Sequence, residues 1–242
     1  MPYFLLNNQK INIENYNDDF LLLKRDQNDN LRDEYSLTKI GQVIYKSDIT
    51  FIDEVIATDT EICLKLNNSF KEKDIQKLAN LNYKSELNKI SQNSKTFLMP
   101  VCFEEKDDWN TVEKQTNKTK KEIIESIVNL NFDLAMFGFL PGFVYLNGLP
   151  PKLYCARKSN PSKYVKPNSL AIGGPYLGIY SIPSPGGWNV IGKCAFSLNN
   201  IPYLPPNILN IGDIIRFESV SSEKLYSIQN NISSITAYNG KN

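Results

Sequence analysis

Glycine and proline interrupt the second half of this chain so often that no long helix or strand fits between them. From residue 138 to residue 217, short apolar segments alternate with Pro-Gly and Gly-Gly turns. Segments of this kind are typical of strands in a barrel or a sandwich. We therefore predict strands over residues 133–139, 169–172, 177–182, 188–191, 214–217 and 224–228.

The first part of the chain differs in composition. Residues 1–45 are polar and rich in Asn and Asp, and predict a short strand or two among mobile loops. Residues 48–66 alternate apolar and polar side chains, which indicates strands, and residues 70–81 place Ile75, Leu78 and Leu81 on one face of a predicted helix. We expect an α+β protein with a small α+β N-terminal domain, residues 1–95, followed by a β-barrel domain, residues 96–242.

A helical insertion is predicted near the start of the second domain. Residues 96–103 form an apolar strand whose Pro100 indicates an edge or a bend, because proline cannot donate a ladder hydrogen bond. A short helix can open at Asn110-x-x-Glu113. Thr119-x-x-Glu122 matches a capping box ahead of a second helix. The acidic stretch over residues 104–108 is expected to be a solvated loop, with a metal site as the alternative.

The chain contains no histidine. This excludes a Ser-His-Asp or Cys-His nucleophile system and histidine-rich metal sites. Catalysis would have to use carboxylates, Lys, Tyr, backbone amides or a partner chain. The four cysteines are far apart and form no C-x-x-C pair, so reduced thiols are expected and no metal site is predicted. The sequence assigns no catalytic residue.

Charge and hydropathy exclude two classes of partner. The net charge of +1 predicts no nucleic-acid surface. No apolar run approaches the roughly 20 residues that a membrane-spanning helix needs. The N-terminus lacks a basic leader, so no signal peptide is expected. We expect a cytoplasmic protein.

Three glycine-rich segments carry most of the functional signal: GFLPGFVYL (138–146), IGGPYLGIY (172–180) and PSPGGWNVIGK (183–193). Pro141-Gly142 fits a type II turn with Gly142 at positive φ. The glycines would let backbone amides approach a ligand or another strand. Tight barrel corners with packed aromatic rings are the structural alternative. Gly187 to Lys193 also satisfies G-x-x-x-x-G-K, but Cys194 follows where a phosphate-binding loop needs Ser or Thr.

These segments occur in the order of a known family signature. Together with GLPPKL, the Arg157 segment, the MPVCF strand at 99–103 and IGDIIRF at 211–217, they resemble the Kip-inhibitor/allophanate-hydrolase-subunit-1 family. The resemblance is dense from about residue 97 to residue 220 and essentially absent over residues 1–45. It implies that the C-terminal domain is a cyclophilin-like β-barrel.

The resemblance also implies a function. It suggests the B subunit of an ATP-dependent 5-oxoprolinase, which hydrolyses 5-oxo-L-proline to L-glutamate together with a homologous C subunit and an A subunit. ATP and Mg²⁺ are then expected at the assembled complex, bound wholly or partly by the partners. Family members also include an inhibitor of a sporulation histidine kinase. Carboxyltransferase-type domains acting on a urea-like substrate are a further alternative.

The motifs also supply the expected ligand-binding residues: Pro141, Gly142, Tyr145, Arg157, Tyr176, Tyr180, Pro185, Gly186, Gly187, Trp188 and Lys193. For Arg157, a ligand or interface role and a structural ion pair both stay open. Five residues at three places depart from the family pattern. Ile127 stands where the family has histidine, Tyr176-Leu177 replaces Gln-Thr, and Lys193-Cys194 replaces Arg-Thr.

Overall fold

The computed structural model describes residues 3–6, 9–25, 36–47, 49–67, 71–104, 108–198 and 208–240. The chain divides into two compact units, Met1–Asn93 and Ser94–Asn242. Each has its own apolar core. Within the described ranges, no helix is both long and apolar enough to cross a membrane.

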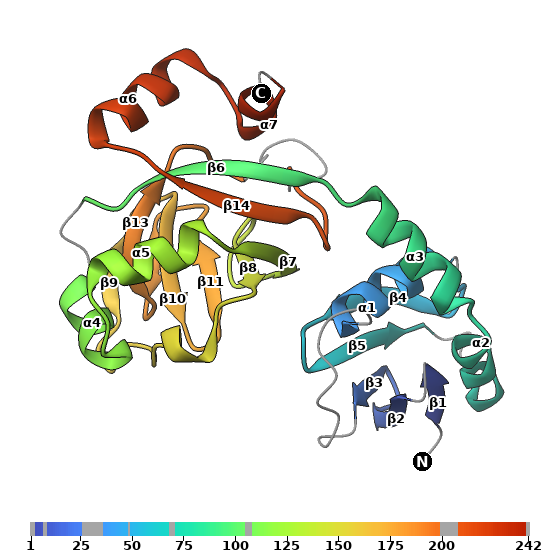
Figure 1. Ribbon diagram of the computed structural model, residues 1–242. Coiled ribbons are helices and arrows are strands. Elements are labelled where there is room, and N and C mark those ends of the chain that lie inside the picture. The colour runs from blue at the N-terminus through green and yellow to red at the C-terminus, as the bar shows by residue number, and fades with distance from the viewer. Residues whose placement is uncertain are drawn as a thin grey trace. The chain divides into compact units, whose positions relative to one another are not determined.

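The first unit is built on an antiparallel sheet with strand order β1-β2-β3-β5-β4 (Figure 1). The strands are β1 (Tyr3–Leu6), β2 (Gln9–Asn17), β3 (Phe20–Arg25), β4 (Ile52–Ala57) and β5 (Glu61–Leu66). Alternate residues of β3 and β5 are buried, as expected for a sheet with one covered face. The strands predicted within residues 48–66 are confirmed. Residues 1–45, predicted to hold a short strand or two among mobile loops, contain the three strands β1, β2 and β3, and residues 26–35 lie outside the described residues.

Helices complete this unit. They are α1 (Leu37–Tyr45), η1 (Glu72–Asp74), α2 (Ile75–Ala79) and α3 (Tyr83–Asn93). The helix predicted over residues 70–81 is confirmed only over residues 72–79, as η1 and α2, and Leu81 lies beyond its end. The helices α1 and α3 were not predicted. The α1 helix begins at Ser36, whose hydroxyl accepts a hydrogen bond from the Lys39 backbone, and it buries Leu37, Ile40 and Ile44.

The second unit is a closed barrel with strand order β10-β11-β8-β7-β14-β6-β13. Its strands are β6 (Thr96–Cys102), β7 (Asn131–Phe137), β8 (Val144–Asn147), β10 (Ser169–Gly173), β11 (Tyr176–Ile179), β13 (Asn189–Cys194) and β14 (Ile214–Ser219). A separate two-stranded sheet pairs β9 (Ser162–Val165) with β12 (Ser184–Gly186). The predicted α+β class with a barrel is confirmed.

The long strands β6 and β14 run parallel, with Ile214 opposite Thr96 and Ser219 opposite Val101 (Figure 1). Buried Asp213 ties their starts together, since its carboxylate accepts hydrogen bonds from the Lys95 and Asn210 backbones at 2.9 and 2.8 Å. Because β6 lies between β14 and β13, the predicted edge position of this strand is wrong. Pro100 stands opposite Glu218 of β14, but its carbonyl accepts from the Ala195 backbone, so its polar groups face the β13 side. On that side β13 pairs only with Val101 and Cys102, so no ladder bond requires the missing N–H.

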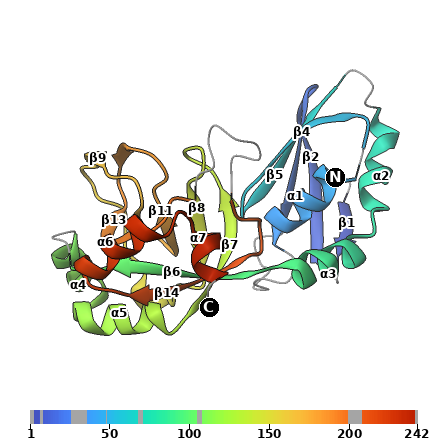
Figure 2. The ribbon, with the colours of Figure 1, turned by 90° about the horizontal axis from the view of Figure 1, so that it is seen from above.

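Helices pack on the barrel from two sequence regions. The predicted insertion is confirmed as α4 (Trp109–Thr116) and α5 (Lys120–Val128), and α5 begins with the predicted capping box of Thr119 and Glu122. Near the end of the chain, α6 (Ser222–Asn231) and α7 (Ile235–Asn239) lie against β6 (Figure 2). A short helix, η2 (Pro151–Leu153), follows β8.

The α6 helix corrects one prediction, because residues 224–228 were expected to be a strand. Ser221 caps this helix by accepting a hydrogen bond from the Lys224 backbone. Leu225 and Ile228 are three residues apart, so a helix places both on the face that packs against the barrel, where both are buried.

Candidate functional site

An aromatic cluster covers the outer face of the barrel along β8, β10, β11 and β13. Along β11, Leu177 and Ile179 point into the barrel core, while Gly178 lies against an outer cluster that includes Phe143, Tyr180 and Trp188. Such a division is expected because successive side chains of a strand point to opposite faces. The rings meet edge to face. The centroid of the Phe143 ring lies 5.1 Å from that of the Tyr180 ring and 5.5 Å from that of the Trp188 ring.

Glycines of the second and third segments make room for these rings. A Cβ atom at Gly173 would clash with the Trp188 indole, and one at Gly178 would lie 2.6 Å from Trp188 and 2.8 Å from Phe143. A Cβ at Gly186 would overlap the Tyr180 hydroxyl. At Gly173, Gly178 and Gly186, the glycine is therefore explained by the packing of aromatic rings and not by the approach of a ligand.

The Pro-Gly turn adopts the predicted geometry. The Phe143 backbone donates to the Leu140 carbonyl at 3.0 Å, and Gly142 has a φ of 77°. The Ser181 hydroxyl anchors the turn by donating to the Pro141 carbonyl at 2.6 Å. Pro141 and Gly142 thus shape the backbone and do not line the pocket that the aromatic cluster forms.

Phe139, just before this turn, has a strained backbone. Its φ is 65°, and the Leu140 backbone donates to the Gly138 carbonyl at 2.7 Å, which closes a γ-turn around Phe139. Its side chain is 60% exposed and meets Phe143 and Tyr180 edge to face. A bulky residue at positive φ is uncommon and concentrates at functional sites.

A pocket of about 190 Å³ opens between this strained loop and the SPGGW segment. Six of the expected residues line it: Tyr145, Arg157, Tyr180, Gly186, Gly187 and Trp188. Phe139, Phe143, Lys158 and Pro161 also line it and were not predicted from the sequence. We call this the aromatic pocket.

Arg157 supplies the positive charge of the aromatic pocket. Its guanidinium carbon lies 5.8 Å from the Trp188 ring centroid, a cation–π contact. No carboxylate of the described residues lies within ion-pair distance of Arg157, which disfavours the structural ion pair. Its neighbours are held firmly. Buried Asn189 donates to the Ala156 carbonyl at 2.9 Å, and the Lys158 backbone donates to the Gly187 carbonyl at 2.7 Å.

Tyr180 provides a neutral hydroxyl in this pocket. Burial raises the pKa of Tyr180, while a hydrogen bond from the Trp188 backbone and the charge of Arg157 oppose that rise. The phenol is therefore protonated at neutral pH. Burial also raises the pKa of the Cys155 thiol to about 11, so this cysteine is no thiolate nucleophile.

Three expected residues lie elsewhere. Tyr176 packs against Tyr145 with ring centroids 5.8 Å apart and does not line the aromatic pocket. Pro185 is exposed on β12. Lys193 lines a second cavity, which shares Lys158 with the aromatic pocket. The described residues contain no group of three acidic or cysteine side chains that could hold a metal ion. Residues 105–107 of the acidic stretch lie outside the described residues.

Residues 11–209 match the family described as "Carboxyltransferase domain, subdomain C and D". The chain belongs to this family. Two curated relatives are both named as the B subunit of 5-oxoprolinase. The Bacillus subtilis protein is 34% identical over 131 residues, which are 53% of this chain and 55% of that protein. The Escherichia coli O157:H7 protein is 36% identical over 99 residues, 41% of this chain and 45% of that protein. The chain thus spans about half the length of these relatives.

A solved structure of urea carboxylase from Kluyveromyces lactis shares the fold of this family member. The TM-score is 0.68 at 16% identity, with 96% of this chain and 24% of that chain covered. The structure also locates the departures from the family pattern. Ile127, Leu177 and Cys194 all belong to the barrel core, whereas Tyr176 and Lys193 do not. Three of the five altered residues are thus buried and do not line the aromatic pocket.

Proposed function

We propose that this chain is the B subunit of a 5-oxoprolinase that hydrolyses 5-oxo-L-proline to L-glutamate with ATP. The observation that carries the proposal is the likeness, at 34% and 36% identity, to relatives with this name. A protein of this kind acts with partners, which we propose to be a homologous C subunit and an A subunit. The solved urea carboxylase supports the fold alone and adds no evidence for a urea-like substrate.

The aromatic pocket suits the proposed substrate. 5-Oxoproline is a small, flat lactam ring that carries one carboxylate. The faces and edges of Phe143, Tyr145 and Trp188 offer apolar walls for the ring, and Arg157 offers a planar fork for the carboxylate. The pocket has a volume of about 190 Å³. Pockets that hold drug-sized ligands have roughly 300–1,000 Å³, so the smaller volume here matches a substrate smaller than a drug.

The chemistry explains why partners are needed. A lactam carbonyl is a poor electrophile, and phosphorylation of its oxygen would make attack by water possible. The G-x-x-x-x-G-K match offers no phosphate-binding loop, since Asn189–Cys194 is the barrel strand β13 and no helix follows it directly. No described carboxylate cluster fits Mg²⁺. We therefore propose that ATP and Mg²⁺ are held mainly by the partner chains, and we assign no metal-dependent step to this chain.

Reconstitution tests this function. The chain would be mixed with its proposed A and C partners, and glutamate release from 5-oxoproline would be measured with and without ATP. We expect release only from the complete mixture with ATP. A stable complex that releases no glutamate would contradict the proposal.

Arg157→Ala tests the pocket within that assay. We expect kcat/KM to fall roughly 10-fold to 100-fold, since a charge-assisted hydrogen bond contributes about 1.5–3 kcal/mol. Arg157→Lys should recover only part of the loss, because an ammonium cannot replace the bidentate fork. Arg216→Ala, at an exposed position on β14, is the matched control and should leave turnover unchanged. Normal kinetics for Arg157→Ala would remove Arg157 from the substrate site.

A further inference from the structure

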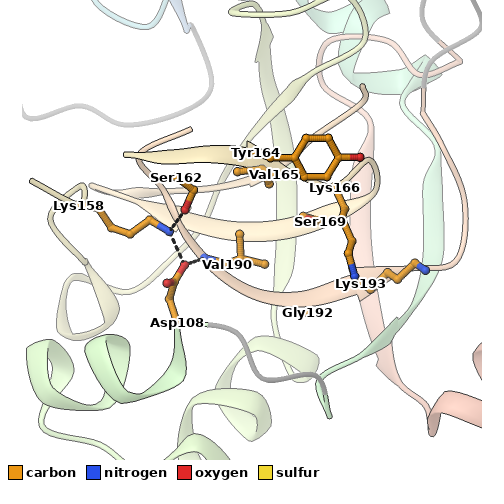
Figure 3. A pocket seen from close by; sticks show the side chains of 10 residues that line it. All are labelled: Asp108, Lys158, Ser162, Tyr164, Val165, Lys166, Ser169, Val190, Gly192 and Lys193. Carbon is orange, nitrogen blue, oxygen red and sulfur yellow. Dashed lines mark hydrogen bonds and ion pairs between the residues drawn. The ribbon is translucent and has the colours of Figure 1, made fainter. Parts of the chain in front are cut away.

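The second cavity, of about 330 Å³, is lined by three lysines and one aspartate (Figure 3). Its cationic residues are Lys158, Lys166 and Lys193, and its acidic residue is Asp108. Three positive charges and one negative charge give a net lining charge of +2. We call this the lysine cavity.

Asp108 is already occupied by other contacts. Its carboxylate accepts hydrogen bonds from the Lys158 ammonium at 2.7 Å and from the Val190 backbone at 2.8 Å. Lys158 also donates to the Ser162 hydroxyl at 2.8 Å. The pair is largely shielded, with the side chains of Lys158 and Asp108 only 16% and 27% exposed. This end of the cavity is therefore neutral and fixed.

The other two lysines have no such partner among the residues that the structure describes. Within the described ranges, no carboxylate lies within ion-pair distance of Lys166 or Lys193. Lys166 directly follows β9, and Lys193 lies on β13. Figure 3 shows both side chains at the opposite end of the cavity from the Lys158–Asp108 pair. Two like charges that line one cavity repel each other, and an anion bound between them would offset this repulsion.

Neutral donors adjoin this cationic end. Ser169 is buried in β10 directly opposite Lys193 in the strand register, and it lines the cavity. Its hydroxyl has no hydrogen-bond partner among the residues that the structure describes. Tyr164 adds a second hydroxyl at the exposed mouth. Two ammonium groups with hydroxyl donors beside them match the several acceptor oxygens of a dianion.

We propose that the lysine cavity binds a phosphate group. The choice of phosphate over other dianions rests on the proposed ATP-dependent function, in which inorganic phosphate and nucleotide phosphates are both present. Lys158 lines both cavities, so the lysine cavity adjoins the aromatic pocket at the end away from Lys166 and Lys193. The proposal concerns binding and positioning, and it assigns no phosphoryl transfer to this chain.

A titration of the whole chain tests the proposal. Inorganic phosphate, pyrophosphate, ADP and ATP would be added in separate series without metal at constant ionic strength, and binding followed by calorimetry and by backbone amide shifts. We expect saturable binding with shifts at Lys166, Ser169 and Lys193. Tighter binding of ATP or ADP than of inorganic phosphate would assign the site to a nucleotide, and the reverse order would assign it to free phosphate.

Lysine variants locate the site. Lys193→Gln and Lys166→Gln should each weaken phosphate binding by about tenfold or more. Lys193→Arg retains the charge and should bind within a few-fold of the native chain. Lys163→Gln is the matched control, since Lys163 lies on the same strand as Ser162 and Tyr164 but does not line the cavity.

Two results would overturn the phosphate site. One is binding that does not saturate, and the other is an equal loss in Lys163→Gln and Lys193→Gln. The circular dichroism of each variant shows whether it is folded, and Lys193→Arg keeps the test valid if a glutamine variant is not. This measurement needs no 5-oxoproline and no partner. Phosphate binding in the absence of glutamate release would therefore contradict the proposed function but leave the phosphate site standing.

Discussion

The inner and outer faces of the same barrel strands have different compositions. On β10, Leu170 and Ile172 point into a barrel core made almost entirely of aliphatic and phenylalanine side chains. Between them, Ala171 points outward, beneath the cluster that contains Phe143, Tyr180 and Trp188. The inner face excludes solvent, whereas the outer face leaves a pocket rimmed by Arg157 and Phe139. Each strand thus stabilises the barrel with one set of residues and forms the candidate site with the alternate set.

The inner face should show the largest effect on stability. Leu170 is fully buried, so Leu170→Ala should lower the free energy of unfolding by about 2–5 kcal/mol. Val190→Ala, at a half-buried outward position on β13, should cost about 1 kcal/mol or less. Urea denaturation of both variants measures the difference. Equal losses in the free energy of unfolding would show that the inner and outer faces contribute equally to stability, which would contradict the proposed difference between them.

The floor of the aromatic cluster should show an intermediate effect. Gly173→Ala puts a methyl group into the Trp188 indole, so Trp188 must move, and we expect a loss of about 1–3 kcal/mol. The tryptophan fluorescence and near-ultraviolet circular dichroism should change with it. Gly187→Ala is the control, since a Cβ there would meet its nearest neighbours at 3.8 Å. An unchanged tryptophan signal in Gly173→Ala would mean that the indole does not rest on this glycine.

Much of the barrel could be predicted because its strands are short and its turns have specific residue requirements. Pro141-Gly142 demanded a turn with positive φ at Gly142, and the structure has it. The α6 helix escaped prediction because Leu225, Tyr226 and Ile228 read as a short apolar run, and only the Ser221 cap signals a helix. The α1 helix was missed because its apolar face follows a long polar stretch.

The candidate site was only partly predictable from local patterns. The motifs indicated both Arg157 and Trp188 as ligand-binding residues, and the structure brings them together. The pairing of Lys158 with Asp108 joins residues that are 50 positions apart, and no spacing rule reveals it. The roles of Gly173 and Gly178 could not be predicted either. A glycine in the sequence indicates a conformationally free backbone, but it does not say that the Trp188 ring occupies the position of the missing Cβ.

The smallest effect on stability is expected at the rim of the outer face. Phe139→Gly removes an exposed ring, which loses edge-to-face contacts with Phe143 and Tyr180 worth about 0.5–1.5 kcal/mol each. Glycine adopts the φ of 65° without strain, which returns about 1–3 kcal/mol, similar in size to the two lost contacts together. The two terms oppose each other, so the free energy of unfolding should change by about 1 kcal/mol or less.

Binding and stability should therefore separate at Phe139. Phe139→Gly removes one wall of the aromatic pocket, so the KM for 5-oxoproline in the reconstituted enzyme should rise while the melting temperature barely changes. Tyr226→Ala, which removes a similarly exposed ring on α6 that lines neither the aromatic pocket nor the lysine cavity, controls for a general loss of surface area. A large loss of stability in Phe139→Gly with an unchanged KM would show that the strained loop serves folding. Phe139 would then belong with the residues that stabilise the barrel and not with those that form the candidate site.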